Sequence, residues 1–206
     1  MIVTDITELN KKKSKVYIDQ EFAFVLYKGE LHSYHVKKGA EISHDDYETI
    51  MKELLPKRAV RRAMNLLKEK SYTKIQLVQK LRDNFYCEDH IAAALSYVES
   101  YGYVDDFAYA TDFIIYRASQ LSKRQIEQKL MQKGIDGKVI AQAFEAFYAD
   151  GNEIEEEQQI QYFLQKKGYS GIKDEKQKQK LIASLLRKGF SMEKIKRATE
   201  KIETEI

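Results

Sequence analysis

The stretch TKIQLVQKLRDNFYCEDHIAAALSYV, residues 73–98, recurs twice further along the chain in altered form. The second copy is SKRQIEQKLMQKGIDGKVIAQAFEAF at residues 122–147, and the third is QKQKLIASLLRKGFSMEKIKRATEKI at residues 177–202. Their starts lie 49 and then 55 residues apart, and the added loop GYSGIKDEK at residues 168–176 accounts for the longer interval. Self-similarity at a regular interval indicates a repeat architecture. Apolar or small side chains share equivalent positions in the three copies, as in Leu77, Ile126 and Leu181, in Leu81, Leu130 and Leu185, in Ile91, Ile140 and Ile195, and in Ala94, Ala143 and Ala198.

The polar residues of each copy predict two helices joined by a tight turn. Thr73 and Ser122 are N-cap residue types, and each is followed at the third position by glutamine, which is the capping-box pattern. Gly134 and Gly189 fall where the first of these helices must end, while Phe85 takes that place in the first copy. The cap before the last helix is Cys87, Asp136 or Ser191. A further helix precedes each copy, at about residues 57–69, 106–118 and 153–167, so each unit is predicted to hold three helices.

The N-terminal part reads differently. Residues 1–37 alternate apolar and polar side chains, which predicts three or four short antiparallel strands. Lys28-Gly29 lies between the last clear strand and LHSYHV, a hairpin signal. Ser43 then caps a helical run, and Pro56 is expected to close that helix and to open the next one.

We therefore predict a mainly α fold, with three tandem three-helix repeats in an elongated, curved arrangement, preceded by a small N-terminal antiparallel β-sheet. One three-helix unit of this size is marginal alone, so neighbouring units should share core surface. The expected domains are residues 1–56 for the sheet and a short helix, and residues 57–105, 106–151 and 152–206 for the three repeats.

Composition excludes several classes of protein. Cys87 is the single cysteine, so an internal disulfide or a cysteine-based metal site is excluded and a reducing compartment is favoured. The chain has neither a signal-peptide pattern nor an apolar run of the roughly 18 residues that a membrane span needs, so we expect a cytoplasmic protein without a membrane partner. We also expect it to be a monomer. Glycine-rich phosphate loops, G-x-S-x-G and H-E-x-x-H are absent, so we expect no catalytic residues, cofactor or metal, and no enzyme.

Charge is strongly segregated beneath a net charge of +3. Residues 57–138 carry a net +5 and residues 165–206 a net +6, whereas residues 139–164 contain six acids and no lysine or arginine. Clustered lysine and arginine favour a polyanion or an acidic protein surface as partner. The acidic stretch would be repelled by phosphate, so a partner of mixed charge is favoured over simple coating of DNA. Among the aromatic residues, Tyr72 beside Lys70 and Lys74 is the one expected to be exposed for base stacking.

Three segments of the chain resemble the RecX family of regulators of the bacterial recombinase RecA. SYGYVDDFAYA at residues 100–110 is similar to the family's G-Y-[LVI]-[DN]-D-x-x-[FY]-A junction. IEQKLMQKGID at residues 126–136 and LIASLLRKGFSMEKI at residues 181–195 resemble the E-L-x-x-K-G-I and L-x-x-R-G-F-x-x-x-x-I segments. The likeness covers residues 59 to about 202, and the N-terminal sheet resembles the extension of longer members. Asn84-Phe85 departs from the family pattern, which has glycine there.

The resemblance implies a helical repeat protein that binds the groove of the RecA–DNA filament, blocks its growth or promotes its disassembly, and restrains strand exchange and coprotease activity. A filament of protein and DNA offers acidic surface and phosphate together, which suits the charge pattern. Charge and helical face predict the contacts as Arg58, Arg61, Arg62, Lys68, Lys74, Arg117, Lys123, Arg124, Lys129, Lys133, Arg187, Lys188, Lys194, Arg197 and Lys201.

The predicted helix at residues 57–69 carries a basic stripe that includes Arg58, Arg61, Arg62 and Lys68, and the last helix carries a second stripe of Lys194, Arg197 and Lys201. Two other functions fit these basic stripes. The chain could bind single- or double-stranded DNA directly and without sequence specificity, since no helix carries the Arg/Asn/Gln cluster that base readout needs. Alternatively, it could be a helical scaffold whose basic faces are only solvated.

Overall fold

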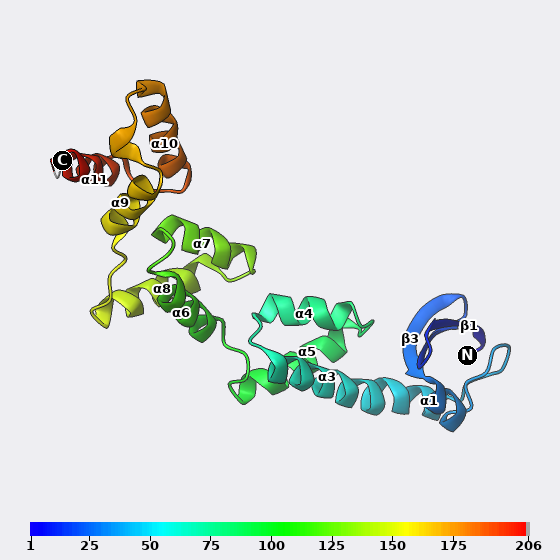
Figure 1. Ribbon diagram of the computed structural model, residues 1–206. Helices are drawn as coiled ribbons and strands as arrows, with labels where there is room; N and C mark the ends of the chain where they lie inside the picture. The colour runs from blue at the N-terminus through cyan, green and yellow to red at the C-terminus, as the bar shows by residue number, and fades with distance from the viewer. Residues whose placement is uncertain (205–206) are drawn as a thin grey trace. The chain divides into compact units, whose positions relative to one another are not determined.

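The computed structural model describes residues 1–204, which fold into two compact units divided between Val104 and Asp105 (Figure 1). The first unit contains a small antiparallel sheet and one three-helix repeat, and the second contains two further repeats. The predicted fold class is confirmed: the chain is mainly α, with three successive three-helix repeats after an N-terminal sheet.

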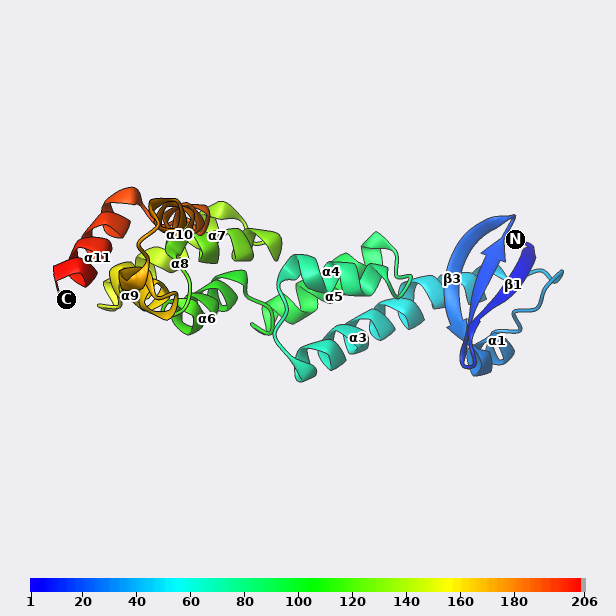
Figure 2. The same cartoon turned by 45° about the horizontal axis from the view of Figure 1, so that its top comes forward.

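The sheet has three strands, in the order β1-β2-β3, with antiparallel neighbours. Alternate side chains along the middle strand, Ser14, Val16 and Ile18, are buried, as a sheet with one covered face requires. Asp19 and Gln20 connect β2 to β3 with positive φ angles of 49° and 73°, as in a type I′ turn. The strands are β1 (Val3–Asn10), β2 (Lys13–Ile18) and β3 (Glu21–Tyr27) (Figure 2).

The predicted hairpin at Lys28-Gly29 is wrong, because a helix, α1 (Lys28–Ser33), follows β3 directly. The Glu30 carboxylate accepts a hydrogen bond of 2.7 Å from the Tyr27 backbone N–H, which satisfies a donor at the start of the helix. Glu30 also forms an ion pair with Arg58 of a later helix. This local capping, together with the tertiary partner, favours a helical turn over the strand that the alternation of LHSYHV suggested.

Ser43 caps the next helix as predicted, with its hydroxyl accepting from the Asp46 N–H at 3.0 Å. Pro56 lies in the first turn of the following helix, as predicted, but the predicted end of the preceding helix is wrong, because the chain stays helical through this residue after one π-helical segment. In that segment the Leu55 N–H donates to the Ile50 carbonyl, five residues back, so the wider turn accommodates a ring that would clash in an α-helix. The consecutive elements are α2 (His44–Thr49), the π-helix η1 (Ile50–Leu54) and α3 (Leu55–Glu69).

The π-helical segment also holds the last helix of the first repeat. The Met51 carbonyl lies 2.7 Å from Nε2 of His90, and since a carbonyl can only accept, Nε2 carries the proton. His90 is 5% exposed, so this bond satisfies a buried polar group.

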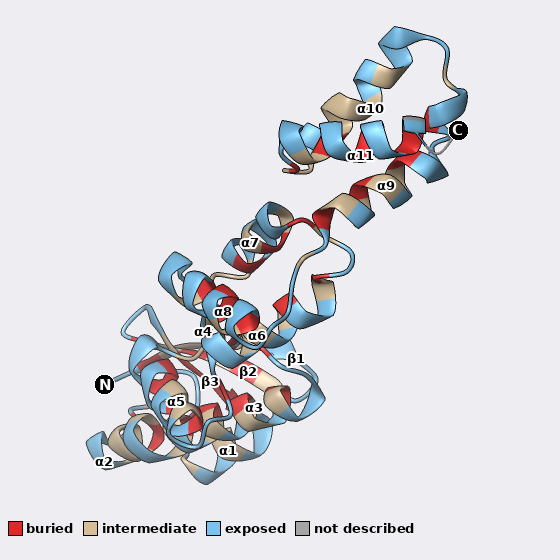
Figure 3. Cartoon of the chain, turned by 90° about the vertical axis from the view of Figure 1, so that its left-hand side faces the viewer, coloured by how far each residue is buried: buried red, intermediate tan, exposed pale blue. Residues whose placement is uncertain are grey.

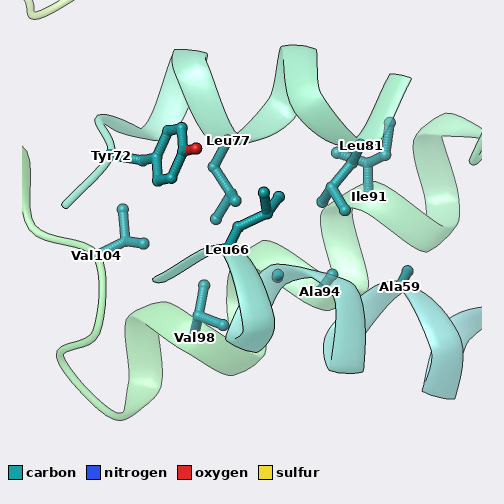
Figure 4. Close-up of a cluster of buried hydrophobic side chains, with 10 residues drawn as sticks. Ala59, Leu66, Tyr72, Leu77, Leu81, Ile91, Ala94, Val98 and Val104 are labelled. Atoms are coloured by element: carbon teal, nitrogen blue, oxygen red, sulfur yellow. The ribbon is translucent and has the colours of Figure 1, made fainter. Parts of the chain in front are cut away.

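The first repeat packs a row of small residues of α3 against its last helix. Ala59, Ala63 and Ala94 are completely buried, which lets the two helices approach closely, and leucines of the middle helix cover them (Figure 4). Thr73 forms the predicted capping box with Gln76. The two further helices are α4 (Lys74–Arg82) and α5 (Glu88–Ser100), with Cys87 at the N-cap of α5.

The second unit repeats this arrangement twice. Asp105 caps the first helix by accepting from the Phe107 and Ala108 N–H groups at 2.8 and 3.1 Å, and Ser122 forms the second predicted capping box. Each of its six helices contributes buried residues to one of two hydrophobic cores, and Figure 3 colours these residues red. The elements are α6 (Asp106–Arg117), α7 (Lys123–Gln132), α8 (Gly137–Ala149), α9 (Glu156–Lys166), the 3₁₀ turn η2 (Tyr169–Gly171), α10 (Glu175–Arg187) and α11 (Met192–Thr204).

The turn in the middle of each repeat has the same left-handed backbone, including the one without glycine. Phe85 has a φ of 66°, beside 83° for Gly134 and 90° for Gly189. Its ring lies 6.0 Å from the Phe22 ring and 4.3 Å from Nζ of Lys15, both on the sheet. Contact with the sheet compensates the strain of a side chain in this conformation, so the Asn84-Phe85 departure leaves the turn geometry unchanged.

Replacing Gly189 by alanine should destabilise the second unit by at least about 2 kcal/mol, since left-handed backbone alone costs a side chain roughly 1–2 kcal/mol. A Cβ at this position would lie 2.7 Å from Cβ of Arg124, a clash that adds to the strain. Gly151→Ala is the matched control, because Gly151 has a φ of 78° with open space around it. The free energy of unfolding of both variants is measured by urea unfolding followed by circular dichroism. Equal losses in the two variants would contradict a role for the Arg124 contact.

Candidate basic surface

The predicted basic stripe on α3 divides into inward and outward members. Arg58 points inward, with its side chain 12% exposed. Its guanidinium forms the ion pair with Glu30, donates to the Val25 carbonyl at 3.0 Å and lies 4.8 Å from the Tyr27 ring centroid. Arg58 therefore joins α3 to β3 and α1, and its charge is used within the first unit.

The rest of that stripe faces outward to different degrees. Arg61 and Lys68 are exposed, and within residues 1–204 their side chains have no hydrogen bond, ion pair or ring contact. Arg62 is half-buried, and its Nε has no hydrogen-bond partner among the described residues. Burial raises the pKa of the nearby Tyr86 to about 12, and the charges of Arg58 and Arg62 only partly oppose that rise. The phenol is thus neutral beside these cations at physiological pH.

The prediction that Tyr72 is an exposed stacking residue is wrong, because it is 8% exposed. Its ring packs with Leu66, Leu77 and Val104 in the core of the first repeat (Figure 4). Lys70 covers the ring, with Nζ 4.8 Å from its centroid. Nearby Lys74 is exposed and forms an ion pair of 2.7 Å with Glu99.

An exposed cluster of tyrosines that the sequence analysis missed lies at the end of α5. Tyr101 lies 4.9 Å from Tyr97 and 5.8 Å from Tyr103, measured between ring centroids. Their spacing could have predicted this cluster. Tyr97 and Tyr101 are four residues apart, and side chains at i and i+4 meet on one helical face; Tyr103 follows two residues later, just beyond the helix end.

In the second unit, several predicted cations lie over aromatic rings. Nζ of Lys188 is 4.1 Å from the Phe163 centroid, Nζ of Lys123 is 5.1 Å from that of Phe144, and Nζ of Lys133 is 5.5 Å from that of Tyr109. Such cation–π contacts fix long side chains without neutralising their charge. Arg117 lies over Tyr116 at 4.8 Å in the same way, and it donates to Oε1 of Gln120 at 2.8 Å.

The stripe along α11 is paired with acids of the same unit. Lys194 lies 3.0 Å from Glu156, and Glu157 lies 3.5 Å from Arg197 and 3.4 Å from Lys201. The acidic stretch that separates the two basic segments of the sequence thus partly neutralises the second segment. Sequence reasoning could not find these pairs, since 38 to 44 residues separate the partners.

The same acidic segment joins the second repeat to the third. The buried Glu156 accepts from the Lys123 backbone N–H at 3.0 Å, at the start of α7. Ser122 donates to the Lys188 carbonyl at 2.7 Å, and Nε2 of Gln159 donates to the Ala118 carbonyl at 2.6 Å. Glu156, Ser122 and Gln159 therefore join the second repeat to the third. Arg124 adds a contact, because its aliphatic stem covers Gly189 of the third repeat.

Two other predicted cations, Lys129 and Arg187, face solvent. Lys129 on α7 and Arg187 at the end of α10 are exposed, and within the described chain their side chains make no hydrogen bond, ion pair or ring contact. We call Arg61, Lys68, Lys129 and Arg187 the unpaired cations. They are the predicted residues whose charges remain most available to a partner.

No helix within residues 1–204 is long and apolar enough to cross a lipid bilayer. Within the same residues, no three histidine, cysteine, aspartate or glutamate side chains gather as a metal site would require.

Comparison with known proteins gives a consistent result. Residues 105–143 match the family model of the second three-helix domain of RecX, and residues 155–199 match that of the third. A "Regulatory protein RecX" from Clostridioides difficile (strain 630) is 27% identical over 98% of this chain and 95% of its own.

Solved structures share the fold. The crystal structure of a regulatory protein RecX superposes with a TM-score of 0.64 at 22% identity, and covers 97% of this chain and 98% of its own. That of RecX from Lactobacillus salivarius gives a TM-score of 0.60 at 22% identity, over 74% of this chain and 98% of its own. A "Regulatory protein RecX" from Caldanaerobacter subterraneus subsp. tengcongensis is 31% identical over 96% of this chain and 98% of its own, and with a match of this extent the chain belongs to the RecX family of regulatory proteins.

Proposed function

We propose that this protein is a negative modulator of RecA that binds the groove of the RecA–DNA filament and inhibits filament growth. The unpaired cations are the observation that carries the proposal, since exposed arginine and lysine without internal partners keep their charge for phosphate and for acidic protein surface. Inhibition of strand exchange and of coprotease activity, and with it a role in DNA repair, recombination and the SOS response, follows from the same binding. We also propose that the protein acts as a cytoplasmic monomer without enzymatic activity.

Such a regulator needs no chemistry of its own. A protein that binds one state of a filament more tightly than another shifts the population toward that state. The paired stripe on α11 suits a composite partner, because its acids would repel bare phosphate while its lysines and arginine remain able to exchange partners.

The test measures the DNA-dependent ATP hydrolysis of RecA on single-stranded DNA, with this protein titrated well below stoichiometry at two salt concentrations. A variant with alanine at all four unpaired cations should need at least tenfold more protein for half inhibition. The matched control replaces four lysines of the first unit that have carboxylate partners, and so removes the same charge, namely Lys28, Lys38, Lys52 and Lys57. Its inhibition should stay within twofold of the unmodified protein.

Equal inhibition by the two variants would refute the assignment of the unpaired cations. Direct, non-specific DNA binding is the second candidate, favoured by the same exposed charges. It predicts no inhibition until the protein saturates the DNA, and a steep loss at higher salt, because each phosphate contact contributes about one to the slope of log affinity against log salt.

A further inference from the structure

A groove with a volume of about 850 Å³ lies within the second unit, between the second and third repeats. One wall is a single face of α9 and the residue before it, since its members recur at intervals of three and four positions. The facing wall is the end of α6 and the loop that follows it. The α9 wall consists of Glu155, Gln158, Gln159, Tyr162, Phe163 and Lys166, and the α6 wall includes Ile115, Ala118, Ser119, Gln120 and Leu121.

The walls combine exposed apolar surface with amide groups. Tyr162 is 67% exposed and Ile115 is 55% exposed, so both hold apolar area that nothing in their own unit covers. Gln120 and Gln158 line the groove as well. The Gln158 carboxamide offers both a donor and an acceptor, and the Gln120 amide nitrogen offers a donor beside the oxygen that accepts from Arg117. A peptide backbone also offers one donor and one acceptor per residue, so these amides match it. The volume lies within the range of ligand-binding clefts.

Side chains of opposite charge lie at the two ends of the groove. Glu153 and Glu155 line it before the start of α9, and Lys166 lines it at the end of that helix. Lys188 belongs to the basic end, because its Nζ lies 4.1 Å from the ring of Phe163, one turn before Lys166. Glu155 and Lys166 are 11 residues apart. At a rise of about 1.5 Å per helical residue this is about 16 Å, the length of about five residues of extended chain.

We propose that this groove binds an extended segment of about five residues from a protein partner. The segment places a basic side chain at the Glu153/Glu155 end, an acidic side chain at the Lys166/Lys188 end, and an apolar side chain against Tyr162. The two carboxylates repel the phosphates of a nucleic acid, which is why a peptide is the occupant. The groove uses none of the unpaired cations, so this inference and the proposed RecA regulation can fail separately.

The test uses libraries of pentapeptides that are acetylated and amidated, so that only side chains carry charge. Four libraries fix the end residues as Lys and Glu, Glu and Lys, Lys and Lys, or Glu and Glu, with the three central residues randomised. The full-length protein should retain the two libraries of opposite end charges at least tenfold more than the two of like charge. Both chain directions are included because the groove could accept either.

A charge swap makes the test specific. Replacing Lys166 and Lys188 together by glutamate reverses the charge of that end, and should shift the preference to the library with lysine at both ends. Tyr162→Ala should abolish the retention of every library, whereas Tyr116→Ala, a tyrosine of the same unit with 66% exposure outside the groove, should not change it.

Two results would overturn the proposal. Equal retention of all four libraries would remove the charge complementarity on which it depends. Retention of an oligothymidylate probe that disappears in Tyr162→Ala would assign the groove to nucleic acid instead. The ATP hydrolysis assay with RecA is run on the same variants, and unchanged inhibition by Tyr162→Ala would leave the proposed function in place whichever result the peptides give.

Discussion

Glu156→Ala should lower the free energy of unfolding of the second unit by about 2–3 kcal/mol, since a hydrogen bond to a charged group contributes roughly 1.5–3 kcal/mol. Glu156 has a side chain only 10% exposed, and it holds two partners on different repeats. One oxygen accepts from the Lys123 N–H and the other from Nζ of Lys194, both at 3.0 Å. Removing the carboxylate leaves the part-buried N–H at the start of α7 without its acceptor.

The neighbouring residue provides a matched control. Glu157 carries the same charge and also pairs with α11, but its side chain is 29% exposed and its partners are more exposed still. Glu157→Ala should therefore cost less than about 1 kcal/mol, as exposed ion pairs do. Urea unfolding gives the two stabilities, and hydrogen exchange locates the loss. Faster exchange at the start of α7 in Glu156→Ala alone is expected; equal losses in both variants would contradict a special role for Glu156.

The repeats could be predicted because their signals are local. Capping boxes at Thr73 and Ser122 and the apolar spacing around Leu81 and Leu130 lie within single helices, so the sequence displays them directly. The predictions failed where contacts with a distant part of the chain determine the local structure. The helix through Pro56 depends on a π-helical turn, whose freed Met51 carbonyl is satisfied by His90, 39 residues away.

The candidate surface shows the same limit. Helical periodicity places Arg58 with Arg61 and Arg62 on one arc of α3, but it cannot show that the sheet covers one edge of that arc. Nor can composition show that Glu157 lies beside Arg197. Exposure together with the absence of an internal partner separates a cation that is available to a partner from one used in folding, and both follow from tertiary contacts.

Arg58→Ala should destabilise the first unit by about 3 kcal/mol, the lower end of the cost of breaking a buried ion pair. The substitution removes the partner of Glu30, whose side chain is 24% exposed, and leaves the Val25 carbonyl without its donor. It also removes the cation from the Tyr27 ring. Arg58→Lys should recover less than half of this loss, because an ammonium cannot reach a carboxylate, a carbonyl and a ring with the fixed fork of a guanidinium.

Arg61→Ala is the control on the same helix, and we expect it to change stability by no more than about 0.5 kcal/mol, as surface substitutions do. The two variants should thus separate folding from binding: Arg58→Ala lowers the urea midpoint, while Arg61→Ala keeps it and weakens the inhibition of RecA. A double-mutant cycle with Glu30→Ala isolates the ion pair, for which we expect a coupling energy within the roughly 0.5–3 kcal/mol found between contacting residues. A coupling near zero, or equal stability of the two arginine variants, would show that Arg58 does not hold the sheet to α3. Arg58 would then return to the surface that a partner could use.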